Sequence, residues 1–235
     1  MKRAFLGAFA LVTATALTVQ SGAAPAPKAR PVQRDWSRTV VATPEGGFRM
    51  GNPAARVKLI EYGSLTCSHC AAFARTGTPT LVANHVRRGT VSYEYRNFVL
   101  NGADLAASLL ARCSGPHGFF RFADSLYAAQ GEWMGRLSGM SAAQSAELQS
   151  LPPAERLVRL AEIGGLTQRA AGVGVTPAKA RLCLADQAAV TRLGQMYGEA
   201  EQRGVLGTPT FYVNGVRADV ITWAALEPII RRAGG

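Results

Sequence analysis

The chain has 235 residues, of which 48% are hydrophobic and 17% charged, and its formal net charge is +11. This length predicts one domain, or one domain with an insertion. The basic residues are spread along the chain without interleaved aromatics, which argues against nucleic-acid binding despite the charge. A general preference of the source genome for arginine over lysine explains the positive charge more simply.

Residues 1–24 have the pattern of an export signal. Lys2 and Arg3 precede an apolar stretch over residues 5–19, and Ser21-Gly22-Ala23 supplies the small residues of a cleavage site. The stretch is short for a membrane-spanning helix, which needs about 20 residues, and an uncleaved anchor is the alternative. We predict export to the periplasm, a protein that is soluble after cleavage, a disordered linker over 25–38 and a domain over 39–235.

The first half of the domain shows strand and helix patterns in alternation. Residues 57–62 form an apolar run typical of a buried strand, preceded by a turn at Gly51-Asn52-Pro53. Residues 70–86 are helical in pattern, with a break expected near Thr78-Pro79. Aromatic and β-branched residues predict a second strand over 91–98.

The second half is mostly helical. Apolar stripes and capping residues predict helices over 103–113, 119–129, 152–163, from Thr176-Pro177 onward, over 186–203 and over 223–232. Residues 131–150 give only weak signals. An Asn214-Gly215 turn between strand-like residues 211–213 and 216 onward predicts a hairpin. The order indicates a three-layer α/β domain with a helical insertion at about 102–186.

Cys67-Ser68-His69-Cys70 follows the first strand and has the layout of a thiol–disulfide redox centre. A helix that starts at Cys67 leaves its sulfur at the helix N-terminus, where free N–H groups and the helix dipole favour a thiolate. The thiolate is the reactive form in disulfide exchange, and Cys70 is close enough to close the disulfide. Such a pair needs no organic cofactor and no metal.

Zinc sites use the same cysteine spacing but need two further ligands. His69 lies inside the motif, and His85 and His117 belong to no second ligand motif. A module that holds copper or zinc is therefore the less favoured interpretation. A chaperone-like binder that keeps its cysteines incidentally is a further alternative.

The four cysteines of the chain predict two pairs in an oxidising compartment. If Cys67 pairs with Cys70, then Cys113 and Cys183 are left to form a structural disulfide. That bond would close a loop of about 70 residues, which the chain-entropy model values at roughly 4 kcal/mol. Two separate buried thiols are the alternative.

Two segments together resemble the DsbA-like branch of the thioredoxin superfamily. They are Glu61-Tyr62-Gly63-Ser64-Leu65-Thr66-Cys67-Ser68-His69-Cys70 and Gly204-Val205-Leu206-Gly207-Thr208-Pro209-Thr210-Phe211. The likeness extends over roughly residues 39–233 and includes Arg96-Asn97-Phe98. It implies an α/β fold with a thioredoxin-like core sheet and an inserted helical subdomain.

The resemblance also implies roles for residues of the two motifs. Cys67 is the exposed sulfur that attacks and is attacked, and Cys70 is its buried partner. His69 is expected to stabilise the Cys67 thiolate. Pro209 is expected to be cis beside the cysteine pair, and Thr208 is expected to offer backbone hydrogen bonds to a substrate peptide.

Three positions make the resemblance less direct. Ser68 stands where the best-known oxidases of this family carry proline, and Thr208 stands where valine is usual, while threonine is common in isomerases. Glu61 takes the place of a buried acid thought to assist proton transfer at the inner cysteine. Its companion lysine is not evident here, and an ordinary exposed glutamate is the alternative.

The favoured interpretation is an exported oxidase that introduces disulfides into reduced, unfolded secreted proteins. The resemblance implies a membrane quinone-linked partner that reoxidises it. An isomerase or a reductase of the same compartment is the alternative. Only about 30 residues lie between the signal and the core, too few for the dimerisation domain that such isomerases carry, so we expect a monomer.

Overall fold

The computed structural model describes Met1 and residues 34–235. The expected signal and most of the expected linker lie outside the described residues. The last part of that linker is structured, contrary to expectation, because Trp36–Arg38 form a turn of 3-10 helix, η1. Asp35 caps this turn by accepting from Ser37 N at 3.1 Å, and Trp36 N donates to Arg87 O at 3.2 Å.

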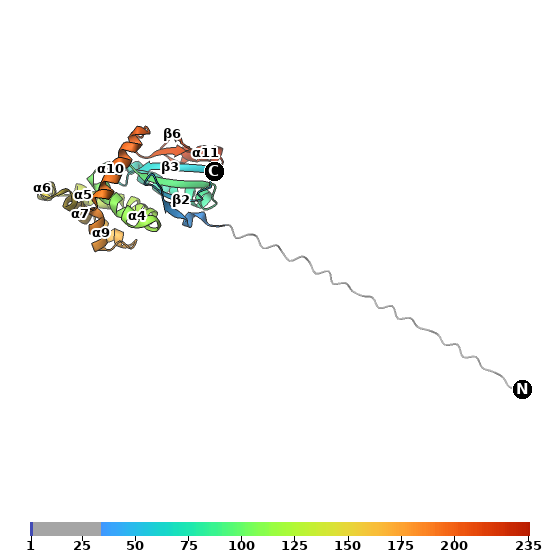
Figure 1. The fold of residues 1–235 in the computed structure, drawn as a ribbon, viewed down its shortest axis with the longest axis horizontal. Helices are drawn as coiled ribbons and strands as arrows, with labels where there is room; N and C mark the ends of the chain where they lie inside the picture. Colours follow the sequence, from blue (N-terminus) through green and yellow to red (C-terminus); the bar gives the residue numbers. More distant parts are fainter. Residues whose placement is uncertain (2–33) are drawn as a thin grey trace. The chain divides into compact units, whose positions relative to one another are not determined.

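A six-stranded mixed sheet forms the centre of the fold, in the order β1-β2-β4-β3-β5-β6 (Figure 1). β3 and β4 are parallel, and each of the other neighbouring pairs is antiparallel. The strands are β1 (Val40–Ala42), β2 (Phe48–Gly51), β3 (Val57–Gly63), β4 (Val91–Asn97), β5 (Thr210–Val213) and β6 (Val216–Ala218).

The segment between β3 and β4 is divided more finely than the sequence predicts. It comprises α1 (Ser68–Thr76), α2 (Thr78–Leu81) and the π-helical turn η2 (Val82–Val86). The break falls at Gly77, where the chain leaves α1 just before Thr78-Pro79. The predicted break near this proline is therefore confirmed.

A helical block separates β4 from β5. Its members are α3 (Gly102–Cys113), α4 (Gly115–Ala128), α5 (Gln130–Ser138), α6 (Ala142–Ser150), α7 (Pro153–Ile163), α8 (Leu166–Ala171), α9 (Pro177–Leu184) and α10 (Gln187–Gln202), and α11 (Trp223–Arg232) ends the fold. Residues 131–150, which give weak signals in the sequence, therefore lie mostly in α5 and α6. Helices α5, α6, α7 and α9 lie together at the end of the domain away from β6 and α11 (Figure 1).

The two-residue alternation of β3 separates two buried clusters. Leu59 lies in the main core with Phe73 of α1 and Phe211 of β5. Tyr62 lies in a second cluster with Ala200 of α10. Odd-numbered residues of β3 therefore face α1, and even-numbered residues face α10. The predicted α/β architecture, a core sheet interrupted by helices, is confirmed.

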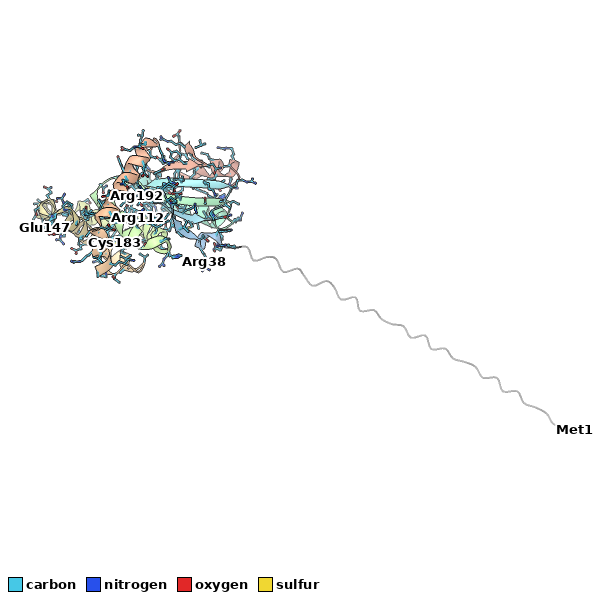
Figure 2. The ribbon with its side chains drawn as sticks, viewed as in Figure 1. Met1, Arg38, Arg112, Glu147, Cys183 and Arg192 are labelled. Atoms are coloured by element: carbon cyan, nitrogen blue, oxygen red, sulfur yellow. A yellow bond between two sulfur atoms is a disulfide. The ribbon has the colours of Figure 1, made fainter. Side chains whose placement is uncertain are left out.

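β1 and β2 were not predicted from the sequence. They have only three and four residues, and neither shows a clean alternation of buried and exposed positions. Their turn is held by two arginines of the helical block. Arg112 of α3 donates to Gly46 O and Arg192 of α10 donates to Glu45 O, each at 2.7 Å. Figure 2 labels both arginines.

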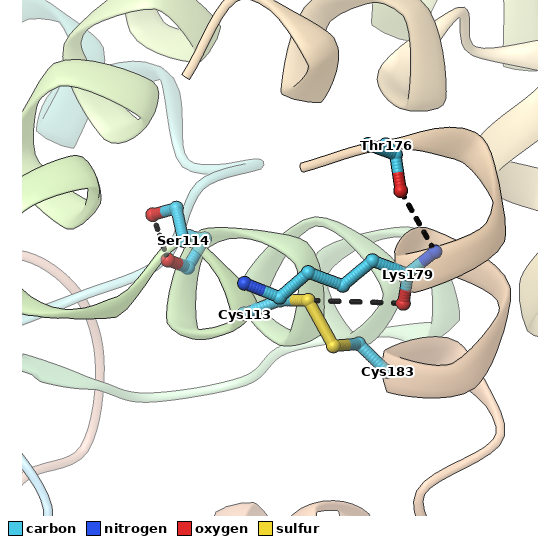
Figure 3. Close-up of a disulfide and its surroundings, with 6 residues drawn as sticks. Cys113, Ser114, Thr176, Lys179 and Cys183 are labelled. Carbon is cyan, nitrogen blue, oxygen red and sulfur yellow. Dashed lines mark hydrogen bonds between the residues drawn. A yellow bond between two sulfur atoms is a disulfide. The ribbon is translucent and has the colours of Figure 1, made fainter. Parts of the chain in front are cut away.

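A disulfide between Cys113 and Cys183 joins α3 to α9 (Figure 3). The two Cα atoms are 6.0 Å apart, and 70 positions separate the two residues in sequence. The bond therefore ties the first helix of the block to its seventh. Among residues 34–235, no helix is both long and apolar enough to cross a bilayer.

Candidate active site

Cys67 is the N-cap residue of α1. β3 ends at Gly63, and a three-residue loop carries the chain from the C-terminal end of this interior strand to Cys67. The Cys67 sulfur accepts from Cys70 N at 3.5 Å, and as a thiol it donates to Thr208 O at 3.2 Å. The sulfur thus sits where the helix presents unpaired N–H groups, as the motif predicts.

The two cysteines have opposite acid–base properties. The hydrogen bond from the Cys70 side chain is the largest cause that lowers the pKa of Cys67 to about 5, and the backbone N–H groups of Cys70 and His69 add to it against the effect of burial. Burial raises the pKa of Cys70 well above that of a free thiol. At neutral pH the half-buried Cys67 is a thiolate and the buried Cys70 is a thiol.

Ser68 and His69, the two residues between the cysteines, are both exposed. His69 acts on Cys67 through its backbone N–H. In the described part of the chain, no hydrogen bond joins the imidazole of His69 or the hydroxyl of Ser68 to either sulfur. The contribution of His69 to the Cys67 thiolate therefore comes from its backbone N–H and not from its imidazole.

Thr208, the residue before Pro209, lies against Cys67. Their peptide bond is cis, and Pro209 is buried. The carbonyl of Thr208 accepts from the Cys67 thiol, while the Thr208 hydroxyl is buried without a hydrogen-bond partner among the described residues. Thr210 Oγ1 donates to Gly207 O at 2.7 Å and closes the turn that carries this peptide.

Glu61 is buried, with only 2% of its surface exposed, so it is not the exposed residue of the alternative interpretation. It faces α1 from β3, and Tyr93 OH donates to Glu61 Oε2 at 2.5 Å. Burial raises the pKa of Glu61 to about 8, against the opposing effect of the Tyr93 hydrogen bond. Tyr93 of β4 is thus the hydrogen-bond partner of Glu61, for which the sequence shows no companion lysine.

Asp104 of α3 fixes the loop before Cys67. It is fully buried and accepts from Leu65 N at 3.0 Å and from Leu100 N at 2.9 Å. Burial raises the pKa of Asp104 to about 6, although these hydrogen bonds favour its carboxylate. Its link to the active-site loop was missed in the sequence, where Asp104 reads as an ordinary acidic residue in the first turn of a helix.

Two further residues of the helical block hold the same loop. Gln130 Nε2 donates to Leu65 O at 2.9 Å and to Cys67 O at 3.0 Å, and Tyr127 OH donates to Ser64 O at 3.1 Å. All three hydrogen bonds span more than sixty residues in sequence, and no local pattern signals them. The helical block therefore positions the first cysteine as well as covering the sheet.

A thiolate at a helix N-terminus, a buried second thiol and a buried carboxyl define a thioredoxin-type redox site. In the described part of the chain, no three His, Cys, Asp or Glu side chains are grouped so that they could hold a metal ion. The arrangement can exchange thiols and disulfides with the sulfur atoms alone.

Residues 43–232 match the family model described as Thioredoxin, so the chain belongs to the thioredoxin family. It is similar to a protein-disulfide isomerase from Novosphingobium aromaticivorans, with 30% identity, 80% of this chain and 97% of that chain covered, and a TM-score of 0.73. It shares its fold with the α-DsbA1 of Wolbachia pipientis, at 20% identity and a TM-score of 0.66. The match covers 83% of this chain and 94% of that chain.

Curated relatives from Rickettsia bellii and Rickettsia typhi are provisionally named protein-disulfide oxidoreductases. They are 28% and 30% identical over 191 and 172 residues, which cover 80% and 72% of this chain. The matched parts cover 65% and 55% of those two proteins. The chain thus spans between about half and two thirds of the length of these relatives.

Proposed function

We propose that this protein is a thiol:disulfide oxidoreductase of the oxidase type, which introduces disulfides into reduced secreted proteins. The unequal acidity of Cys67 and Cys70 carries this proposal. Stabilisation of the Cys67 thiolate favours the reduced enzyme. A reduced form that is stabilised makes the Cys67–Cys70 disulfide a strong oxidant.

The reaction starts from the oxidised pair. A substrate thiolate attacks Cys67 Sγ, the Cys67–Cys70 bond breaks, and Cys70 leaves as a thiolate that takes up a proton. A second substrate thiolate then attacks the substrate sulfur of the mixed disulfide. The substrate disulfide forms, Cys67 leaves as a thiolate, and the enzyme has gained two electrons.

Glu61 is the proton donor to Cys70 in this scheme. Its pKa of about 8 keeps it protonated at neutral pH, and its charge state is coupled to that of Cys70. A protonated carboxyl supplies a proton to the departing Cys70 thiolate. Thr208 borders Cys67 just before the cis-proline Pro209, and the backbone of Thr208 is the site that we assign to the substrate peptide.

We place the protein in the periplasm as an exported monomer. The signal-like residues 1–24 support export, and the Cys113–Cys183 disulfide suits an oxidising compartment. Because each turnover leaves the pair reduced, a two-electron oxidant must restore it. The family resemblance favours a membrane quinone-linked protein in that role.

An isomerase is the second candidate. The Novosphingobium protein, at 30% identity, is named a protein-disulfide isomerase, and threonine stands before the proline here. An isomerase must return its Cys67 to the reduced form after rearranging a substrate. It therefore needs a disulfide that is less oxidising than that of an oxidase.

Oxidative refolding separates the two candidates. The oxidised protein is mixed at equal concentration with a reduced, unfolded ribonuclease, and substrate disulfides are counted by thiol titration. We expect rapid transfer by the parent and no transfer by Cys67→Ser or Cys70→Ser, because neither variant can form the Cys67–Cys70 disulfide that accepts the electrons. Reactivation of a scrambled ribonuclease by the reduced protein, without net transfer to the reduced one, would instead establish the isomerase.

A further inference from the structure

Basic residues gather at one end of the sheet, although they are spread along the sequence. β3 and β4 are parallel, so both strands begin at this end, whereas Cys67 follows the opposite end of β3. Four segments lie where the two strands begin: residues 34–38, 52–58, 84–91 and 228–235. They carry one acid, Asp35, and eight basic residues, which are Arg34, Arg38, Arg56, Lys58, Arg87, Arg88, Arg231 and Arg232.

Contacts between the four segments bring these residues together. Trp36 N donates to Arg87 O at 3.2 Å, and the Trp36 ring lies against Gly89. Gly234, which follows α11, lies against the side chain of Arg56, so the C-terminal residues are beside the start of β3 (Figure 1). The eight basic residues therefore share one end of the domain, which we name the basic end.

Two arginines of different segments border the same opening at the basic end. Arg88, before β4, and Arg231, near the end of α11, both line a pocket of about 260 Å³. The other lining residues are Asn84, His85, Thr90 and Gly235, and no acidic side chain lines the pocket. Arg88 and Arg231 thus bring two positive charges to one open space.

The charges of the basic end are balanced differently from those of the helical block. In the block, five arginines each pair with a glutamate: Arg136, Arg159, Arg169, Arg181 and Arg192. At the basic end, Arg87 pairs with Asp35 and Arg231 with Glu227. The other six basic residues form no ion pair with any residue that the structure describes, and all of them except Lys58 are exposed. The basic end therefore has an excess of positive charge.

Exposed cations that lack acidic neighbours attract an anionic partner. Single-stranded nucleic acid is not favoured, because its bases stack on aromatic rings. Trp36 is the only Trp, Tyr or Phe of the four segments, and the guanidinium of Arg34 lies 4.1 Å from the centre of its ring while Gly89 lies against it. Anionic phospholipid headgroups require no stacking and attract clustered lysines and arginines.

The position of Arg34 also favours a membrane. Arg34 belongs to the basic end, and the signal-like residues 1–24 precede it in the chain. An export signal engages a membrane, which brings the residues that follow it close to the lipid. The basic end is therefore the part of the domain that such a segment would bring to the membrane surface first.

We propose that the basic end docks the protein reversibly on the anionic phospholipid headgroups of a membrane surface, with the cysteine pair turned toward the water. The seven residues of β3 separate Arg56 from the loop before Cys67 by about 20 Å. The docked protein thus keeps Cys67 open to substrate proteins near the membrane. Because salt screens such an attraction, docking is weak enough to reverse, and the protein can turn its cysteines toward a membrane-bound reoxidant.

The test is flotation of the protein with vesicles of phosphatidylcholine, with or without phosphatidylglycerol. We expect binding to the phosphatidylglycerol vesicles at low ionic strength and its loss as salt is added. Pure phosphatidylcholine measures any binding by the apolar residues of the signal-like segment, which salt should not reverse. Absence of salt-sensitive binding to the anionic vesicles would overturn the proposal.

A variant of the basic end carries Arg56→Gln, Arg88→Gln and Arg232→Gln, three exposed residues without an ion pair to a described residue. Each lost cation should weaken binding about fivefold, so the lipid concentration that binds half of the protein should rise on the order of a hundredfold. Binding as tight as that of the parent would contradict the assignment of the docking surface.

The matched control carries Arg121→Gln, Lys179→Gln and Arg203→Gln, which remove the same charge from exposed positions outside the basic end. It should bind nearly as tightly as the parent. Equal weakening in the two variants would show that net charge alone is responsible, and would overturn the proposal. So would tighter binding to a single-stranded RNA than to the anionic vesicles, or binding of inorganic phosphate without any binding to vesicles.

The orientation has its own measurement. Alkylation of Cys67 by iodoacetamide in the reduced protein should be equally fast with and without anionic vesicles, because the docked end is the one away from the cysteines. Protection of Cys67 by the vesicles would refute this orientation. Neither measurement depends on disulfide transfer, so the docking proposal and the oxidase function fail independently.

Discussion

Cys67 and Cys70 stand three positions apart, and the start of one helix makes them chemically unlike. The first has its sulfur beside the free N–H groups of α1 and the carbonyl of Thr208. The second has turned inward, where no water reaches its sulfur. The chemistry of the pair follows from this difference in surroundings rather than from the residue types.

The acidity of Cys67 gives a direct prediction. The rate of alkylation of the reduced protein by iodoacetamide should rise with pH to a plateau with a midpoint near pH 5. Because hydrogen bonding from Cys70 is the largest cause, Cys70→Ala should move the midpoint upward, whereas Cys70→Ser keeps a donor and should move it less. A midpoint near that of a free thiol, about 8.5, would show that the helix terminus does not act on Cys67.

The same pKa shift makes the stability of the reduced protein depend on pH. The folded pKa of Cys67 lies below its unfolded value, so the thiolate stabilises the fold fully above the unfolded pKa of about 8.5. This contribution should fall as pH decreases and disappear below about pH 5. The difference in free energy of unfolding between the reduced parent and Cys67→Ser, measured with urea, should therefore shrink as pH falls. A difference that stays constant with pH would contradict this prediction.

At the scale of the elements, the sequence was informative wherever the pattern was local. The apolar run of β3, the Thr176 cap of α9 and the Asn214-Gly215 turn each depend on neighbours within a few positions. β1 and β2 were not predicted, because three or four residues are too few to show an alternation of polar and apolar positions. The helical pattern of residues 131–150 was weak in the sequence, in part because α6 buries only Leu148.

The supports of the site could not be predicted for a related reason. Asp104, Tyr127 and Gln130 bind the loop before Cys67 from three different helices. Each is an ordinary helical residue in sequence, and its partner lies about 40 to 65 positions away. The cysteines were found because their own spacing carries the chemistry, whereas Tyr93 was missed because only the register of β3 and β4 brings it to Glu61.

The disulfide between α3 and α9 gives a prediction at this scale. Replacing both Cys113 and Cys183 with serine should lower the free energy of unfolding by roughly 4 kcal/mol, because the bond restrains a loop of about 70 residues in the unfolded chain. Urea unfolding of the oxidised proteins measures this loss. The double variant Cys67→Ser, Cys70→Ser is the control, since its closed loop is far shorter and its predicted loss is smaller. A loss below about 1 kcal/mol would contradict the entropic account.

At the scale of the whole molecule, the sheet and the helical block build one site from both parts. β3 carries Glu61, the end of β3 leads to Cys67, and the turn before β5 brings Thr208 against the sulfur. The helical block holds the loop between them. This arrangement brings together the two motifs recognised in the sequence, whose residues Cys67 and Thr208 are 141 positions apart. The net positive charge has no evident part in the chemistry.

The reduction potential of the Cys67–Cys70 pair tests the central claim most directly. The protein is equilibrated in glutathione buffers, and the fraction of oxidised pair is measured while the Cys113–Cys183 disulfide is followed separately. A stabilised Cys67 thiolate predicts a potential near about −120 mV, as in DsbA. A potential near about −270 mV, as in thioredoxin, would contradict the oxidase and identify a reductase.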